Sequence, residues 1–167
     1  NPYLDDFYRD MHRWSFHLQI YFLHHRFAGQ VEINNSQGGV IQDRTIYEDV
    51  EIFAKNLHKM NYMTDRDWST YQNLFKNMTQ FLKKPDLIIY IKASTDTLLS
   101  RIHNRDRDFE REISPEYLHS LNISYDKWIN NCKDQKVITI ESDGFNIFKD
   151  NEKLQTILKQ IETELNQ

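Results

Sequence analysis

Cysteine, proline and glycine are scarce in this chain of 167 residues, which contains one, three and four of them respectively. The single cysteine, Cys132, excludes an internal disulfide and agrees with a reducing compartment. With so few glycines and prolines no linker or repeat stands out, and residues 1–167 are expected to form a single domain. We therefore expect one globular domain of a cytoplasmic protein.

Long apolar runs and an excess of positive charge are also absent. No run approaches the roughly 20 apolar residues of a membrane-spanning helix, so no membrane partner is expected. The formal net charge is −4, which argues against electrostatic binding of a nucleic acid polymer. The seven histidines show no HExxH-like ligand spacing, so the sequence predicts no zinc site.

Helical and strand patterns alternate along the chain. Short runs rich in β-branched residues predict strands at 40–42, 86–92 and 137–140. The second run is continuous and apolar, which is typical of a strand buried on both faces of a parallel sheet. Strands separated by helices indicate an α/β fold. Helices are expected at about 4–26, 45–60 and 64–82, from 94 or 95 onward, from 114 towards 128, and over 154–165.

Three polar residues, Tyr8, Gln19 and Arg26, are spaced so that they share one face of the first expected helix. A phenol, an amide and a guanidinium on one face could line a polar pocket. The alternative is an exposed polar stripe.

Asp43 and Arg44 directly follow the first expected strand, at the strand end where ligands bind in open α/β sheets. An aspartate there can hold Mg²⁺, and the arginine can reach a phosphate or a reacting oxygen. The alternative is a surface ion pair. On the next helix Asp49 and Phe53 are four residues apart and share a face, where Phe53 could stack on a flat ring or simply pack in the core.

Arg101, Arg105 and Arg107 form an R-x3-R-x-R segment that is followed by Glu110. Arginine is the side chain best suited to clamping phosphate oxygens. Acidic residues interleave with the arginines, so a solvated loop of mixed charge is an equally good interpretation.

Together these segments resemble the deoxynucleoside kinase family, which includes deoxyguanosine, deoxycytidine and deoxyadenosine kinases. The sequence resembles the bacterial members of the family. The likeness extends from Asn1 through the last expected strand. The motifs that carry it are Arg13-Trp14-Ser15-Phe16 with Gln19, Gln42-Asp43-Arg44-Thr45-Ile46-Tyr47-Glu48-Asp49 with Ile52-Phe53-Ala54, Pro85-Asp86-Leu87-Ile88-Ile89-Tyr90, and the segment from Arg101 to Glu110.

The resemblance implies a P-loop kinase-like, three-layer fold with a parallel sheet, of about five strands in the complete protein and about three here. It implies transfer of the γ-phosphate of ATP to the 5′-hydroxyl of a deoxynucleoside in nucleotide salvage, with Mg²⁺ as cofactor. It also implies a homodimer formed through the first long helices.

The resemblance further implies a role for each candidate residue. Gln19 binds the base edge, Phe53 stacks on the base, and Arg26 pairs with Asp49 at the base end of the pocket. Tyr8 and Glu110 bind the sugar 3′-hydroxyl, Asp43 lies near Mg²⁺, and Arg44 orients the 5′-oxygen. Arg101, Arg105 and Arg107 belong to a lid at about 101–113 that closes over the phosphates, and Asp143 and Phe145 lie near the adenine of ATP.

The sequence departs from the family at one point. The P-loop pattern GxxxxGK[ST] and the Glu-Pro motif that supplies the general base do not occur in these 167 residues. We expect them in a segment of roughly 35–40 residues ahead of Asn1. Without that segment the chain is not expected to catalyse phosphoryl transfer.

Two alternatives remain at this stage. A thymidylate-kinase-like enzyme would phosphorylate a nucleotide and would need positive charge where Tyr8 and Glu110 stand. A non-catalytic helical binding module would not explain the arrangement of Gln19, Arg26 and Asp49. Because a buried aspartate only accepts hydrogen bonds, the expected substrates are purine deoxynucleosides or deoxycytidine, ahead of thymidine.

Overall fold

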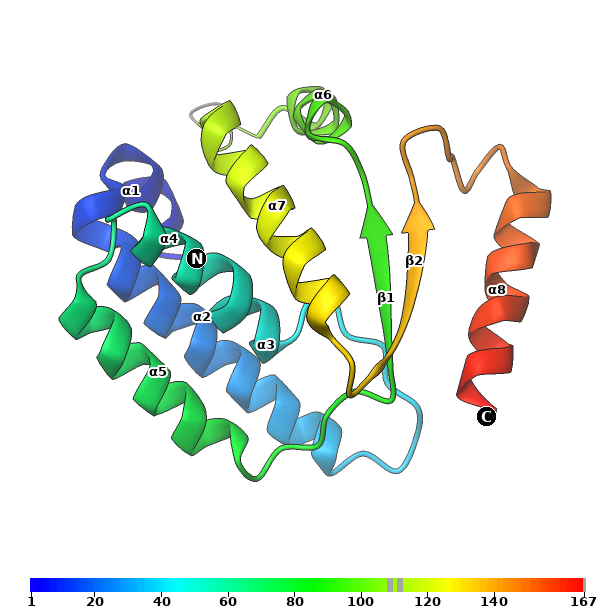
Figure 1. Ribbon diagram of the computed structural model, residues 1–167, viewed down its shortest axis with the longest axis horizontal. Coiled ribbons are helices and arrows are strands. Elements are labelled where there is room, and N and C mark those ends of the chain that lie inside the picture. Colours follow the sequence, from blue (N-terminus) through cyan, green and yellow to red (C-terminus); the bar gives the residue numbers. More distant parts are fainter. Residues whose placement is uncertain (108–109, 111–112, 167) are drawn as a thin grey trace.

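The computed structural model describes residues 1–107, 110 and 113–166. Its first half is a bundle of helices, shown in blue to green in Figure 1. The bundle consists of α1 (Leu4–Arg9), α2 (Met11–Asn34), α3 (Ile46–Glu48), the π-helix η1 (Asp49–Ala54), α4 (Lys55–Lys59) and α5 (Asp65–Thr79).

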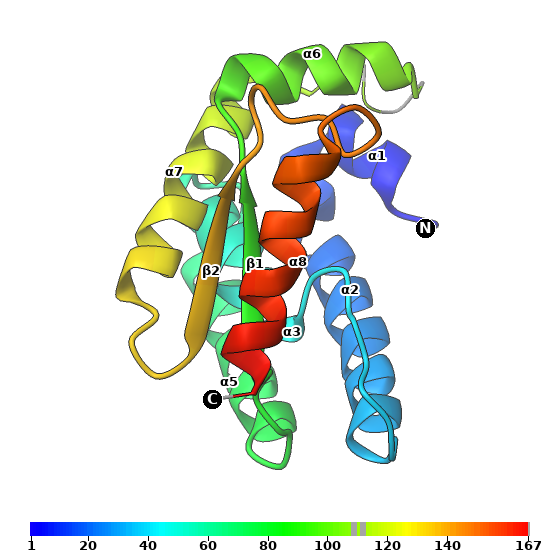
Figure 2. The same cartoon turned by 90° about the vertical axis from the view of Figure 1, so that its right-hand side faces the viewer.

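The second half contains a small parallel sheet. Strand β1 (Leu87–Lys92) pairs with β2 (Lys136–Glu141), with Leu87 opposite Lys136 and Lys92 opposite Glu141. The connection between them carries α6 (Thr95–Arg105) and α7 (Pro115–Asn131), and α8 (Asn151–Leu165) follows β2. In Figures 1 and 2, α7 and α8 lie on opposite sides of the sheet, and α7 separates the sheet from the helical bundle. The α/β layering expected from the sequence is therefore confirmed.

Side-chain caps account for several helix starts that the sequence predicts. The hydroxyls of Thr64, Ser94 and Ser114 accept hydrogen bonds from the backbone two or three residues into α5, α6 and α7. Pro115 occupies the first turn of α7, where its missing N–H costs nothing. The ends of these helices and of both strands agree with the sequence prediction to within a few residues.

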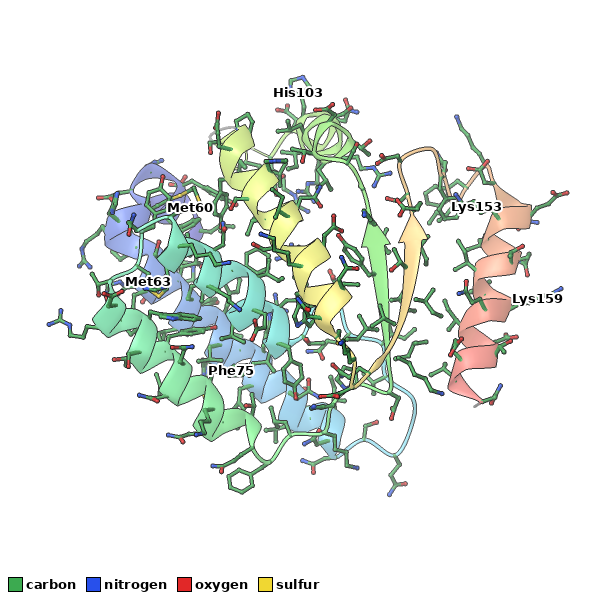
Figure 3. All side chains as sticks on the ribbon, in the orientation of Figure 1. Met60, Met63, Phe75, His103, Lys153 and Lys159 are labelled. Atoms are coloured by element: carbon green, nitrogen blue, oxygen red, sulfur yellow. The ribbon has the colours of Figure 1, made fainter. Side chains whose placement is uncertain are left out.

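The hydrophobic core lies inside the helical bundle and beneath α7, not on the sheet. It contains residues from α1, α2, α3, η1, α4, α5 and α7, and Figure 3 shows Met60 and Met63 at the end of the bundle where α4 meets the following turn. The fully buried members include Phe7, Leu18, Leu23, Ile46, Ile52, Leu57 and Tyr71.

The prediction of one continuous helix over 4–26 is wrong at Asp10. Its φ of −146° lies outside the helical range, and its carboxylate accepts a hydrogen bond from the backbone N–H of Arg13 at 3.0 Å. Asp10 thereby becomes the N-cap of α2 and separates it from α1. The premise that Tyr8, Gln19 and Arg26 share one helix is therefore also wrong.

The strand predicted at 40–42 does not form. The Val40 side chain is 49% exposed and that of Ile41 is 99% exposed. A strand needs a neighbouring strand for its backbone hydrogen bonds, and within the described part of the chain the sheet consists of β1 and β2 alone. Without such a neighbour this short segment stays irregular.

Strand β1 is not buried on both faces, contrary to the expectation. Its side chains alternate: Tyr90 faces α7 and its ring stacks on that of Tyr125, while Ile91 on the other face is 64% exposed. The apolar run thus reflects burial of one face only in this structure. In the ranges 1–107, 110 and 113–166, no helix has the length and apolar character needed to cross a membrane.

Candidate active site

The centre of the site is an ion pair between Arg26 on α2 and Asp49 at the start of η1. The Arg26 Nε donates to Asp49 Oδ1 at 2.8 Å and lies 2.8 Å from Oδ2 as well. The Arg26 side chain is 18% exposed and that of Asp49 is 3% exposed. Within the described residues Asp49 Oδ2 is buried and makes no well-directed hydrogen bond, although the Arg26 Nε lies close to it.

The environment of Asp49 favours its neutral form to an unusual degree. Burial raises the pKa of this carboxyl to about 6, although the neighbouring Arg26 opposes the rise by charge and by hydrogen bonding. A carboxyl group whose pKa is raised by burial and lowered by a neighbouring charge is typical of functional sites.

Gln19 on α2 is the second buried polar group that the sequence singles out. Its side chain is 2% exposed, and among the described residues nothing donates to its Oε1. A buried amide oxygen without a partner costs on the order of 1–3 kcal/mol. Gln19 Oε1 and Asp49 Oδ2 are thus two buried acceptor oxygens that lack a hydrogen bond among the described residues.

The loop before α3 places Asp43 and Arg44 beside this centre. Arg44 has a φ of 62°, in the left-handed region that side chains rarely adopt. Its guanidinium lies 4.8 Å from the centroid of the Phe53 ring, on one face of that ring. Asp43 is exposed. The structure thus brings Arg44, Phe53, Arg26 and Asp49 together, and the binding roles assigned to them stay predictions.

A second group of charges gathers around Glu110, which is 8% exposed. Arg105 makes a double hydrogen bond to its carboxylate, with distances of 2.7 and 3.0 Å, and Arg107 lies 3.6 Å away. Tyr8 belongs to the same group: burial raises the pKa of its hydroxyl, the charge of Glu110 adds to the rise, and Arg44 and Arg105 oppose it. The charge of Glu110 thus acts on Tyr8, and the roles of both residues in sugar binding stay predictions.

The lid expected at about 101–113 is only partly described, because residues 108, 109, 111 and 112 lie outside the described residues. Beside its described part is a cavity of about 360 Å³. The residues that line the cavity are Leu99, Ile102, His103, Asp106, Arg107, Glu110 and Ile113.

Arg101, Asp143 and Phe145 lie apart from these groups, at the carboxyl ends of the strands. Arg101 donates to the hydroxyl of Ser142 at 3.1 Å and to its carbonyl. Asp143 accepts from the backbone N–H of Ser94 at 2.8 Å, a bond that holds the pKa of its carboxyl below the usual value. Phe145 lies under Lys153, whose Nζ is 4.8 Å from the ring centroid; Figure 3 labels Lys153 at the start of α8. The roles assigned to these residues stay predictions.

Three tyrosines at the site were missed from the sequence. Tyr125 meets the edge of Phe53 with 6.2 Å between ring centroids, and burial raises its pKa to about 12. Burial also raises the pKa of Tyr117, which is close to Tyr8 and Arg44, and that of Tyr71, whose hydroxyl lacks a partner among the described residues. Tyr117 and Tyr125 are eight residues apart on α7, a helical spacing that could have indicated a shared face.

Comparison with known proteins identifies relatives of this chain. The model of the deoxynucleoside kinase family matches residues 1–166. A deoxyadenosine/deoxycytidine kinase of Bacillus subtilis is 39% identical over 96% of this chain and 75% of its own length. A deoxyadenosine kinase of Dictyostelium discoideum is 40% identical over 95% of this chain and 64% of its own length, so the chain spans slightly less than two thirds of that relative.

Among solved structures, the deoxyadenosine kinase from M. mycoides with bound dATP is similar over 95% of this chain and 81% of that one. The TM-score is 0.81 and the sequence identity 30%. The similarity thus extends to the arrangement of the helices and the sheet.

Proposed function

Because this chain belongs to the deoxynucleoside kinase family, a family of phosphotransferases, we propose that it phosphorylates the 5′-hydroxyl of a deoxynucleoside in nucleotide salvage. The donor is ATP, and the preferred substrates are purine deoxynucleosides or deoxycytidine. One observation supports the proposal above all: among the described residues, buried Gln19 and the buried Arg26–Asp49 pair each keep an acceptor oxygen without a well-directed hydrogen bond, and Phe53 lies on the same helical segment as Asp49.

The base end of the site determines the substrate class. Asp49 as a carboxylate only accepts hydrogen bonds, so it suits a base that presents an exocyclic amine. Arg26 neutralises Asp49, and a buried charge pair is stable only when both members are satisfied. Thymine has no exocyclic amine, and its methyl group needs space next to Arg26. Phe53, whose ring has the Arg44 guanidinium over one face, would be the ring that stacks on the base.

The sugar and phosphate ends complete the site. Tyr8 and Glu110 bind the 3′-hydroxyl, and Arg44 orients the 5′-oxygen. Arg105 and Arg107 bind the phosphates, with Arg101 as a third lid arginine, and Asp143 and Phe145 contact the adenine of ATP. Phosphoryl transfer needs little covalent chemistry from the protein, so positioning and charge stabilisation by these side chains supply most of the rate.

The donor set fits Mg²⁺ in a limited way. Among the described residues there is no cluster of three or more His, Cys, Asp or Glu side chains. Mg²⁺ in kinases is held by one or two carboxylates together with phosphate oxygens and water, so Asp43 alone is a sufficient protein ligand of that kind. When bound there, the ion neutralises charge on the phosphates.

We propose that the phosphate-binding loop and the general base are supplied by residues outside these 167, since neither motif occurs in the sequence. The edge of β1 that faces away from β2 supports this, because within the described part of the chain it has no neighbouring strand. Of the two alternatives, a thymidylate-kinase-like enzyme would require cationic groups where the buried Glu110 lies, and the family match leaves no basis for a purely helical adaptor.

We also propose a cytoplasmic homodimer formed through α2. The outward stripe of this helix, His24, Ala28 and Val31, is exposed and carries no formal charge other than that of a protonated histidine. Next to it is a group of rings that includes Tyr21 and His25, 4.3 Å apart.

The test of the activity is direct. The protein is expressed from its whole reading frame and incubated with γ-labelled ATP, Mg²⁺ and each deoxynucleoside. Label in the 5′-monophosphate of deoxyadenosine, deoxyguanosine or deoxycytidine supports the proposal. Label in no deoxynucleoside product, or only in a diphosphate formed from an added monophosphate, contradicts it.

A further inference from the structure

Arg26 contacts more than its ion-pair partner. While its Nε bonds to Asp49, its Nη1 donates to the backbone carbonyls of Asp43 and Arg44, each at 3.4 Å. One guanidinium on α2 therefore connects η1 with the turn that carries Arg44. Asp43 and Arg44, which lie 17 and 18 positions after Arg26 in the chain, are thus both held by this single side chain.

The turn that Arg26 contacts is strained. Arg44 has a φ of 62°, a conformation that costs a non-glycine residue about 1–2 kcal/mol and persists only when its surroundings hold it. On the C-terminal side the capping box of α3 holds the chain, because Glu48 accepts from the Thr45 N–H at 2.7 Å. On the N-terminal side, residues 40–42 form no strand. Arg26 is the side chain that the structure shows bonded to the two carbonyls of the turn.

The direction of the Arg44 side chain depends on this turn. Its guanidinium lies over the Phe53 ring at 4.8 Å and close enough to Tyr8 to affect the pKa of that hydroxyl. A rotation of the Asp43–Arg44 backbone would carry the guanidinium away from both. Since a misplacement of about 1 Å can cost on the order of 100-fold in rate, control of this turn matters for turnover.

We propose that Arg26 is a positioning residue for Arg44, in addition to its place beside the base. Through the two carbonyl bonds it keeps Arg44 in its left-handed conformation, so the same side chain that neutralises Asp49 at the base end also aims the arginine at the 5′-oxygen. This role rests on the proposed function for its effect on rate, but the geometry of the turn can be tested without it.

The contacts of Arg26 lead to a pair of variants with different expected effects. Lysine in Arg26→Lys keeps the charge, but a single ammonium cannot replace a planar fork that serves a carboxylate and two carbonyls at once. Asp49→Asn keeps the shape of its partner and leaves the carbonyl bonds of Arg26 in place. Arg13→Lys, on the exposed face of the same helix, is the control for an arginine-to-lysine change.

In steady-state kinetics, Arg26→Lys should lower kcat by about 10-fold or more on every accepted deoxynucleoside, with a smaller change in KM. Asp49→Asn should act mainly on KM, because it alters the base end and leaves the carbonyl bonds of Arg26 in place. A merely base-binding Arg26 would show the reverse pattern for Arg26→Lys, with a raised KM and an unchanged kcat, and that result overturns the proposal.

Amide hydrogen exchange at Arg44 and Thr45 decides the question independently of turnover. Exchange should be faster in Arg26→Lys than in the parent and unchanged in Arg13→Lys. If Arg26→Lys does not fold, Arg26→Gln/Asp49→Asn removes both buried charges and should show the same faster exchange. Unchanged exchange in a folded Arg26 variant overturns the proposal, whereas a parent without kinase activity overturns only the proposed function.

Discussion

Arg105 and Glu110 are bound to each other in this structure through a double hydrogen bond, although the proposed function gives them different parts of the substrates. The side chain of Arg105 is 48% exposed, so Arg105 itself loses little on leaving Glu110, whereas the Glu110 side chain is 9% exposed and would keep Arg107 at 3.6 Å as its cationic partner. Bidentate binding to a carboxylate shows that the guanidinium is presented in the geometry that phosphate oxygens also accept. The pair therefore agrees with two groups that separate when both substrates are bound.

Arg105→Ala should lower kcat by about 100-fold, more than it weakens nucleoside binding, because the arginine acts on charge at the phosphates. Arg9→Ala is the matched control, since Arg9 forms an exposed ion pair with Asp5 at 2.8 Å and has no place in the proposed site. The measurement is steady-state kinetics at saturating ATP. An unchanged kcat for Arg105→Ala would remove this residue from the catalytic group.

Asp49 should make nucleoside binding dependent on pH. Its pKa of about 6 in the folded protein exceeds the value of about 4 in an unfolded chain. Ionised Asp49 accepts from the base, so kcat/KM should fall as the pH drops through about 6, and Asp49→Asn should lose this acid limb.

The titration of Asp49 affects the stability of the folded state in the opposite direction, since stability falls as the pH rises. Because folding raises the pKa, Asp49 stabilises the folded state below about pH 4, and this contribution is lost as the pH rises through about 6. The parent should therefore lose more unfolding free energy than Asp49→Asn between pH 4 and 7. If the two proteins show the same pH dependence in both measurements, Asp49 does not titrate as described.

At the scale of single elements, the segment from Thr45 to Ala54 supplies most of the base end. Thr45 and Glu48 form a capping box at the start of α3, and the chain then widens into the π-helix η1. π-Helical turns are rare and occur frequently at functional sites. This one places Asp49 towards Arg26 and leaves Phe53, four residues later, between Arg44 and Tyr125.

Thr45→Ala should reduce the free energy of unfolding by about 1 kcal/mol through loss of the cap. It should also lower kcat, because Thr45 directly follows the strained Arg44. Thr64→Ala removes the comparable cap of α5, away from the site, and should reduce stability alone. Urea denaturation and kinetics on both variants check this; equal effects on kcat would contradict a link between the α3 cap and the site.

Helices and strands that depend on local sequence were predictable. Features that depend on contacts with distant parts of the chain were not. Helix starts at Ser94 and Ser114 and the strands at 87–92 and 136–141 follow from caps and apolar runs. The break at Asp10 was missed because an aspartate inside a helical pattern caps a new helix only if the backbone turns there. The strand at 40–42 was predicted wrongly because the pattern does not report whether a neighbouring strand is present.

At the scale of the whole molecule, the site assembles from segments that are far apart in sequence. Arg26, Asp49 and Phe53 could be named from their motifs, but their distances could not, because they depend on how α2 packs against η1. Tyr71, Tyr117 and Tyr125 were missed because a tyrosine at helical spacing is indistinguishable from ordinary core packing until the polar groups around its hydroxyl are known. The bonds from Arg26 to the Asp43–Arg44 turn have no sequence signal at all.

The proposed homodimer predicts that the protein sediments at twice the mass of one chain. Val31→Glu places a charge on the exposed stripe of α2 and should shift sedimentation to one copy, because an unpaired charge at the centre of an interface is costly. Lys159→Glu on α8, which Figure 3 shows on the far side of the molecule from the helical bundle, is the control. A parent that sediments as a single copy contradicts the assignment.

The central claim is that a buried Arg26–Asp49 pair makes this protein a kinase for deoxynucleosides with amino-bearing bases. The most direct measurement is kcat/KM for all four deoxynucleosides with ATP, for the parent and for a variant in which Arg26 and Asp49 are both replaced by small apolar residues. Thymidine should be the poorest substrate of the parent and should gain relative to the other three deoxynucleosides in the double variant. Thymidine as the best substrate of the parent, or an unchanged ranking in the double variant, would contradict it.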